Sequence, residues 1–136
     1  MREQEIKNYK ELNKLAEQNG IVIFGGKEDI SIPLCELKQA FSIKENCYNR
    51  SFENLTISEA CDIYADCVAE LSPETILLHI EDAESFKISA DVQILCYTQT
   101  KLYPLSAADS TLFFGKYHRT HIFQNRLCIL TACLIL

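Results

Sequence analysis

Two short, continuous apolar segments, Ile21–Phe24 and Thr75–Ile80, constrain the fold of this chain most strongly. A continuous apolar run of this length is typical of a parallel strand that is buried on both faces. The first run ends in Gly25-Gly26 and the second in an acidic stretch, Glu81–Glu84. Both endings favour a turn. The pattern therefore predicts a parallel sheet with loops of functional interest where these strands end.

Helical periodicity and a third short strand are expected around these runs. Residues 1–20 place apolar side chains at three- and four-residue steps, and Gly20 is expected to end that helix. Pro33 is expected in the first turn of a helix that runs to Phe41. A second short strand is expected near Cys47–Arg50.

The clearest predicted helix begins with a capping box. Thr56 and Glu59 form a T-x-x-E pattern before an apolar helical stripe, which Ser72-Pro73 ends. Residues 21–90 thus read as a βαβαβ core, for which right-handed crossovers predict an α/β fold with the sheet covered on both faces. Ligands bind such sheets outside the carboxyl ends of the strands.

Length and composition favour one domain over residues 1–136. No cofactor and no metal ion are predicted for it. The net charge of −6 and a pI near 5.0 argue against nucleic-acid binding. Seven cysteines, an odd number without C-x-x-C spacing, are interpreted as reduced thiols. The charged N-terminus does not resemble a signal peptide, and Leu127–Leu136 is too short to span a bilayer. We therefore expect a cytoplasmic protein with no membrane contact.

The composition changes at about residue 91. Of 19 acidic residues, only Asp91 and Asp109 lie in residues 91–136, and this tail contains no Glu. Segments 92–97 and 127–136 are possible strands. The change suggests that residues 91–136 are an atypical tail, either a native continuation or a truncated or frame-disrupted end of the domain.

Three segments together resemble the SGNH, or GDSL, hydrolase family: Ile21–Gly25 before a turn, Tyr48–Ser51 after the second strand, and Pro73–Ile80 before a third loop. The resemblance implies a three-layer α/β/α fold with SGNH- or flavodoxin-like winding, incomplete at the C-terminus. It also implies ester or acyl hydrolysis by a Ser after the first strand, an oxyanion-binding Gly and Asn, and a late D-x-x-H.

The residues that would perform this chemistry are not matched. Gly25-Gly26-Lys27 replaces G-D-S, Ser51 stands where the oxyanion Gly is expected, and Ala83 stands where the Asn is expected. No D-x-x-H occurs in the chain. We therefore predict a pseudoenzyme that binds a small ester- or carbohydrate-type ligand, or a protein, in the crevice where the active site of the family would lie. The residues predicted to line that crevice are Gly25, Gly26, Lys27, Asn49, Arg50, Ser51, Glu81 and Ala83.

Alternative hypotheses remain open. An active esterase would use other groups such as Lys27, Ser31 or Glu81, although a solvated lysine and a turn serine are the simpler interpretations. Glu81, Asp82 and Glu84, facing Glu28 and Asp29, could bind a divalent cation, although a solvated acidic rim is the simpler interpretation. The pair His118 and His121 could bind a metal ion, although a loop without a metal site is the simpler interpretation. His79 is expected to be a satisfied core histidine, and Arg50 to form an ion pair with a nearby acid.

Overall fold

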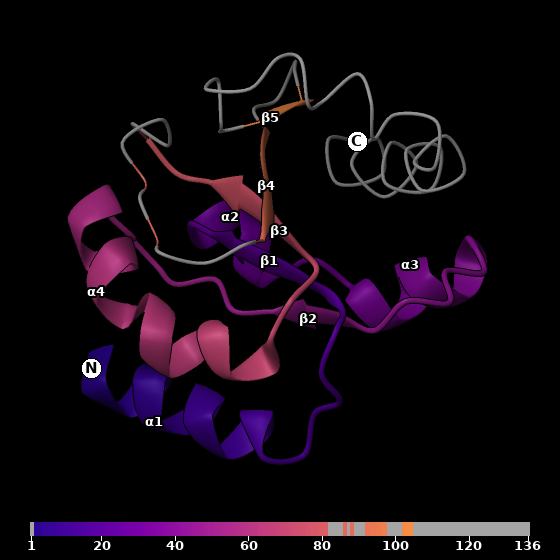
Figure 1. Ribbon diagram of the computed structural model, residues 1–136, viewed down its shortest axis with the longest axis horizontal. Coiled ribbons are helices and arrows are strands. Elements are labelled where there is room, and N and C mark those ends of the chain that lie inside the picture. The colour runs from indigo at the N-terminus through magenta and orange to yellow at the C-terminus, as the bar shows by residue number, and fades with distance from the viewer. Residues whose placement is uncertain (1, 82–85, 87, 89–91, 98–101, 105–136) are drawn as a thin grey trace.

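The computed structural model describes residues 2–81, 86, 88, 92–97 and 102–104, which form a mixed α/β fold (Figure 1). The elements are α1 (Arg2–Asn13), β1 (Ile21–Gly25), α2 (Lys27–Ile30), α3 (Leu34–Ala40), β2 (Cys47–Asn49), α4 (Ile57–Cys67), the 3-10 helix η1 (Ala69–Leu71), β3 (Thr75–His79), β4 (Gln93–Tyr97) and β5 (Leu102–Pro104). None of the helices in this part of the chain is long and apolar enough to cross a membrane.

The strands form one sheet in the order β2-β1-β3-β4-β5. Each neighbouring pair among β2, β1, β3 and β4 runs parallel, and β5 runs antiparallel to β4. The pairing of β1 with β3 extends from Ile21 opposite Thr75 to Gly25 opposite His79. The prediction of a parallel α/β sheet is therefore confirmed. Because the two strands end at the same level, the residues that follow them meet at one edge.

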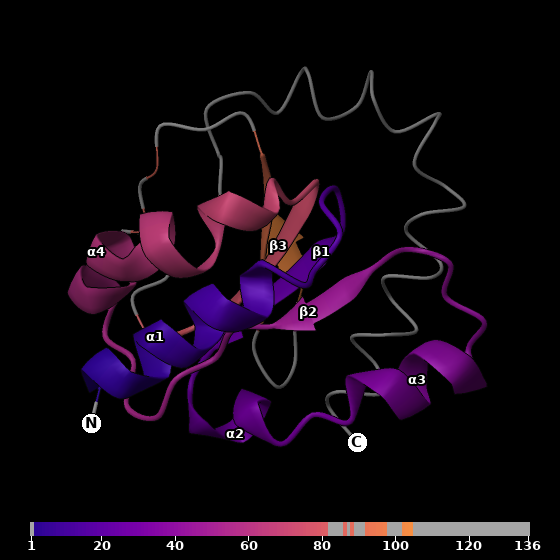
Figure 2. The ribbon, with the colours of Figure 1, turned by 90° about the horizontal axis from the view of Figure 1, so that it is seen from below.

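The buried strand β1 contacts apolar residues on both of its faces. Val22 and Phe24 belong to a cluster that includes the buried residues of α4, whereas Ile21 and Ile23 pack with Leu34 of α3. Figure 2 shows α1 and α4 lying side by side, away from α3. A strand with both faces covered has no solvent face, which explains why its sequence is continuously apolar.

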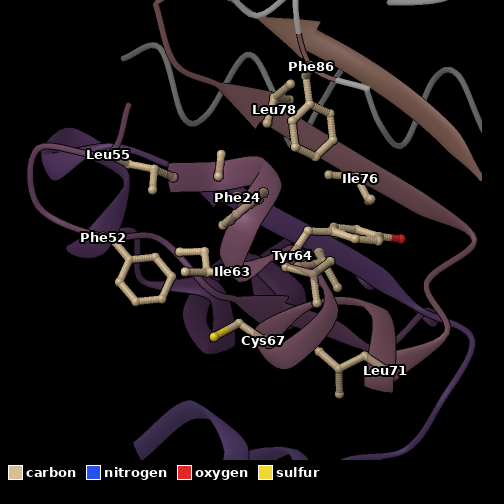
Figure 3. Packing of buried hydrophobic residues seen from close by; sticks show 13 residues of the cluster. Phe24, Phe52, Leu55, Ile63, Tyr64, Cys67, Leu71, Ile76, Leu78 and Phe86 are labelled. Carbon is tan, nitrogen blue, oxygen red and sulfur yellow. The ribbon is translucent and has the colours of Figure 1, made fainter. Parts of the chain in front are cut away.

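Aromatic rings fill the larger of the two clusters (Figure 3). The ring of Phe24 lies edge-on to Phe52 and to Phe86, with centroids 6.4 Å and 6.1 Å apart. Phe52 in turn meets the ring of Tyr9 from α1 at 5.0 Å. Edge-to-face pairs of this kind add to the stabilisation that burial alone provides. This packing fixes the segment after β2 against both β1 and α1.

The predicted capping box at the start of α4 is confirmed. The Thr56 hydroxyl accepts a hydrogen bond from the Glu59 amide at 3.3 Å, and the Glu59 carboxylate accepts one from the Thr56 amide at 3.1 Å. Two backbone N–H groups that the first helical turn leaves without partners are thereby satisfied.

The end of the first helix differs from the prediction. Helix α1 stops at Asn13, and Asn19, not Gly20, adopts the left-handed conformation, with φ of 63°. Gly20 is required for another reason, because a Cβ there would overlap the main-chain carbonyl oxygen of Asn46. The chain before β1 packs too closely on the chain before β2 to accommodate a side chain.

The remaining predicted elements can be placed in turn. The predicted strands near residues 47–50 and 92–97 are confirmed by β2 and β4, and the helix up to residue 41 is confirmed by α3. Pro33 lies at the N-cap of α3, one residue before the first turn. The short helix α2 was not predicted. The possible strand over residues 127–136 lies outside the described residues.

Candidate functional site at the strand ends

Three neighbouring strands bring their carboxyl ends to one edge of the sheet. The Arg50 amide donates to the Ile23 carbonyl at 2.8 Å, and the Phe52 amide donates to the Gly25 carbonyl at 3.0 Å. These bonds hold the segment after β2 against the end of β1, while His79 lies opposite Gly25 on the other side. The segments predicted to follow β1 and β2 at this edge are thus adjacent.

Asp29 connects these strand ends. Its side chain is 4% exposed, and its Oδ2 accepts a hydrogen bond from the Gly26 amide at 2.9 Å. Its main-chain carbonyl accepts a hydrogen bond from the side-chain amide of Asn49. The His79 ring nitrogen Nδ1 lies 3.1 Å and 3.0 Å from its two carboxylate oxygens. One buried carboxylate residue thus contacts the residues that end or follow β1, β2 and β3.

The His79 side chain is 24% exposed, so it is half-buried at the sheet edge and is not enclosed in the core. Its hydrogen bond to Asp29 raises the pKa of the imidazole, desolvation by burial opposes that rise, and the negative charges of Asp29 and Glu28 add to it. A carboxylate on Nδ1 also orients the ring and selects its tautomer. As expected, the His79 ring has a hydrogen-bond partner, and that partner is the Asp29 carboxylate.

The side chains of Ser51 and Asn49 form hydrogen bonds to neighbouring groups of the chain. The Ser51 hydroxyl accepts a hydrogen bond from the Gly25 amide at 3.1 Å, and the Ser51 amide donates to the Asn49 side-chain carbonyl at 3.0 Å. Ser51 is 2% exposed, and its main-chain carbonyl accepts a hydrogen bond of 2.6 Å from the Tyr9 hydroxyl. These contacts make Ser51 a structural link between β1, β2 and α1.

Arg50 directs its guanidinium toward α1. The guanidinium carbon lies 5.2 Å from the ring centroid of Tyr9 and 5.5 Å from that of Tyr48. Its Nε donates to the Asn13 side-chain oxygen at 2.9 Å, and its Nη1 donates to the Asn49 carbonyl at 2.8 Å. No carboxylate pairs with Arg50 among the residues that the structure describes. Cation–π contacts take the place of the expected ion pair.

The other predicted site residues are more exposed or lie outside the described part. The Lys27 side chain is 76% exposed, and its amine lies 3.6 Å from the Glu53 carboxylate. Ser31 and Glu81 are exposed. Ala83 lies outside the described residues, as do Asp82, Glu84, His118 and His121 of the metal hypotheses. Within the described ranges, no group of three His, Cys, Asp or Glu side chains is placed to hold a metal ion.

The Asp29–His79 pair is the feature that sequence reasoning missed. The two residues are 50 positions apart, and each was considered separately. The register of β1 with β3 brings His79 to the Gly25 level, and the unpredicted turn of α2 returns Asp29 to that level. The signal available in the sequence was the position of both residues just at the ends of adjacent predicted strands.

The chain has no match among protein-family models, curated proteins or solved structures. The edge where the strands end combines a half-buried imidazole bound to a carboxylate, a buried serine and two glycine amides that bond within the protein.

Proposed function

We propose that the chain is an SGNH- or GDSL-hydrolase-like domain, with three-layer α/β/α winding, that binds a small ligand at its strand ends without hydrolysing esters. The observation that carries the absence of hydrolysis is the state of Ser51, the serine that bonds to the end of β1. Its hydroxyl is buried and is an acceptor for the Gly25 amide. A nucleophilic serine needs an accessible hydroxyl within reach of a histidine base.

The amide groups at the strand ends support the same conclusion. Ester hydrolysis needs N–H donors that point at the developing oxyanion, and removal of one such donor slows catalysis about 10²- to 10³-fold. Here the Gly25 amide donates to Ser51, and the Gly26 amide donates to the Asp29 carboxylate and to the His79 carbonyl. Both glycine donors of the turn are used to stabilise the fold.

The charge of the rim disfavours an anionic ligand. Glu28 and Glu81 are exposed near the strand ends, and Glu53 lies beside the one lysine of α2, Lys27. An anionic ligand would be repelled by these carboxylates. A neutral ester or a hydroxyl-rich, carbohydrate-type molecule suits this rim better than an anion does.

The second candidate function is ester hydrolysis by other residues, and the Asp29–His79 pair favours it. A carboxylate that orients His Nδ1 is the supporting half of a serine hydrolase triad. Ser31 is exposed and lies two residues after Asp29. In that mechanism His79 would accept the Ser31 proton as the serine oxygen attacks the ester carbonyl. The bond to the alcohol would then break as His79 returns the proton to it, and water would release the acid from the serine.

Hydrolysis of p-nitrophenyl acetate distinguishes the two functions. We expect the full chain, Ser31→Ala, Lys27→Ala and His79→Gln all to release p-nitrophenol at the rate of the buffer blank. Turnover that persists in Lys27→Ala but is lost in both Ser31→Ala and His79→Gln would replace the first proposal with the second.

Ligand binding is tested separately by NMR. Methyl glycosides and short-chain methyl esters are titrated into the ¹⁵N-labelled chain. Binding at the strand ends predicts shifts of the Gly26 and Ser51 amides, while the Ala60 amide of α4 stays unchanged. Saturating shifts elsewhere, or none at these amides with any probe, would contradict a ligand site there.

A further inference from the structure

The amide of Gly26 is shared by the two members of the Asp29–His79 pair. It lies 2.9 Å from the Asp29 carboxylate and 3.2 Å from the His79 main-chain carbonyl. The His79 ring lies against the same carboxylate at 3.0 Å. The start of α2 is therefore joined to the end of β3 through one imidazole, one carboxylate and one amide.

The charged groups near His79 come mostly from helix α2. Helix α2 contributes the carboxylates of Asp29 and Glu28, both of which raise the pKa of His79, and Lys27, which lies beside Glu53. Exposed Glu81 follows two residues later in the chain. Strand β1 contributes Gly25, which does not titrate.

Strand β4 is the other neighbour of β3. Its register places Cys96 opposite Leu78, with Tyr97 next in the strand. Among the described residues named around this edge, His79 is the one whose side chain has an ordinary pKa, about 6.5, between pH 5 and 8.

We propose that His79 and Asp29 form a proton-operated latch, which holds α2 and the Gly25-Gly26 turn against β3 when His79 is protonated and loosens them when His79 loses its proton. The protonated ring forms an ion pair as well as a hydrogen bond with the Asp29 carboxylate, whereas the neutral ring retains only the hydrogen bond. The latch needs no ligand, so it does not depend on the proposed function.

The pH range of the latch follows from the direction of the His79 pKa. Since the folded protein raises this pKa above the unfolded value of about 6.5, the stabilisation is complete below pH 6.5. It is lost as the pH rises through the folded pKa. The strand-end turn is therefore expected to be most rigid in mildly acidic solution.

An NMR titration of the full chain from pH 5 to 8.5 tests the latch. We expect the His79 ring Cε1–H signal and the Gly26 amide to shift with one common midpoint above pH 6.5, while the Ala60 amide stays unchanged. His79→Gln identifies the His79 signal among the three histidines and is expected to abolish the Gly26 titration. Asp29→Asn keeps a side-chain acceptor but removes the charge, and is expected to lower the His79 midpoint.

Three results with the wild-type chain and His79→Gln would overturn the latch. They are a wild-type His79 midpoint at or below 6.5, a Gly26 amide that does not follow it, and a Gly26 titration that persists in His79→Gln. An unchanged His79 midpoint in folded Asp29→Asn would also overturn it. If Asp29→Asn does not fold, the wild-type and His79→Gln titrations still decide the question.

Discussion

Backbone hydrogen bonds join neighbouring segments at both ends of strand β1, and at the carboxyl end three side chains join them. At the amino end, the Ile21 amide donates to the Asn46 carbonyl at 2.7 Å and the Glu74 amide donates to the Gly20 carbonyl at 2.9 Å. At the carboxyl end, the side chains of Ser51, Asp29 and His79 take part. The carboxyl end therefore depends on side-chain identity and protonation as well as on the path of the chain.

A glycine at each end shows the same contrast. A Cβ on Gly20 would overlap the Asn46 carbonyl oxygen, with the Asn46 carbonyl carbon 3.0 Å away, so it would meet backbone. A Cβ on Gly25 would overlap the Asp29 carboxylate, with Cγ at 2.7 Å, so it would meet a side chain. Backbone paired with a strand moves less easily than the end of a side chain, which predicts unequal costs for the two alanine substitutions.

The largest effect is expected from Gly20→Ala. The new methyl group forces the Asn46 backbone away from β1, and overpacking of this kind costs about 3 kcal/mol of unfolding free energy. Urea unfolding followed by circular dichroism measures the loss. Gly26→Ala is the matched control, because its Cβ would meet nothing within 4 Å, and it is expected to stay within about 1 kcal/mol of wild type. Equal losses for the two variants would contradict the comparison.

A smaller effect is expected from Gly25→Ala, about 2 kcal/mol, because the Asp29 side chain can turn away at the expense of its hydrogen bonds. A double-mutant cycle sharpens this prediction. In an Asp29→Ala background, the same substitution is expected to cost less than about 1 kcal/mol, since the group it displaces is gone. Additive losses would show that the backbone, not Asp29, resists the methyl group.

Local sequence patterns predicted the elements whose cause is local. Continuous apolar runs predicted β1 and β3, and the Thr56–Glu59 spacing predicted the start of α4, because strand burial and helix capping act over a few residues. Helix α2 has four residues and no helical apolar stripe, so periodicity could not reveal it. The end of α1 was misplaced because the close approach that requires Gly20 is tertiary.

The candidate site was predicted in location but not in its contacts. The edge where β1, β2 and β3 end was expected from the alternation of strands and helices. The Asp29–His79 pair and the contact of Arg50 with the Tyr9 ring each join residues tens of positions apart. An excess of acidic residues predicted an ion pair for Arg50, but composition does not show which side chain is adjacent.

Tyr9 makes one contact that local sequence predicts and one that depends on tertiary structure. Its substitution is expected to cause the smallest of the three losses of unfolding free energy. Helical spacing predicted an apolar face on the first helix, and the Tyr9 ring packs on Phe52. Its hydroxyl also donates to the Ser51 carbonyl at 2.6 Å, which links α1 to the strand-end site. Tyr9→Phe keeps the ring and leaves this half-buried carbonyl without that donor, so a loss of about 1 kcal/mol is expected.

The same variant shows whether α1 supports the strand-end site. If the Tyr9 hydroxyl positions Ser51, the Gly25 amide, which donates to the Ser51 hydroxyl, should change its chemical shift in Tyr9→Phe, while the Ile21 amide at the amino end does not. Equal shifts at both amides would mean that β1 responds as one unit. The two ends of β1 would then differ in their hydrogen bonds but not in their response to the loss of the Tyr9 hydroxyl.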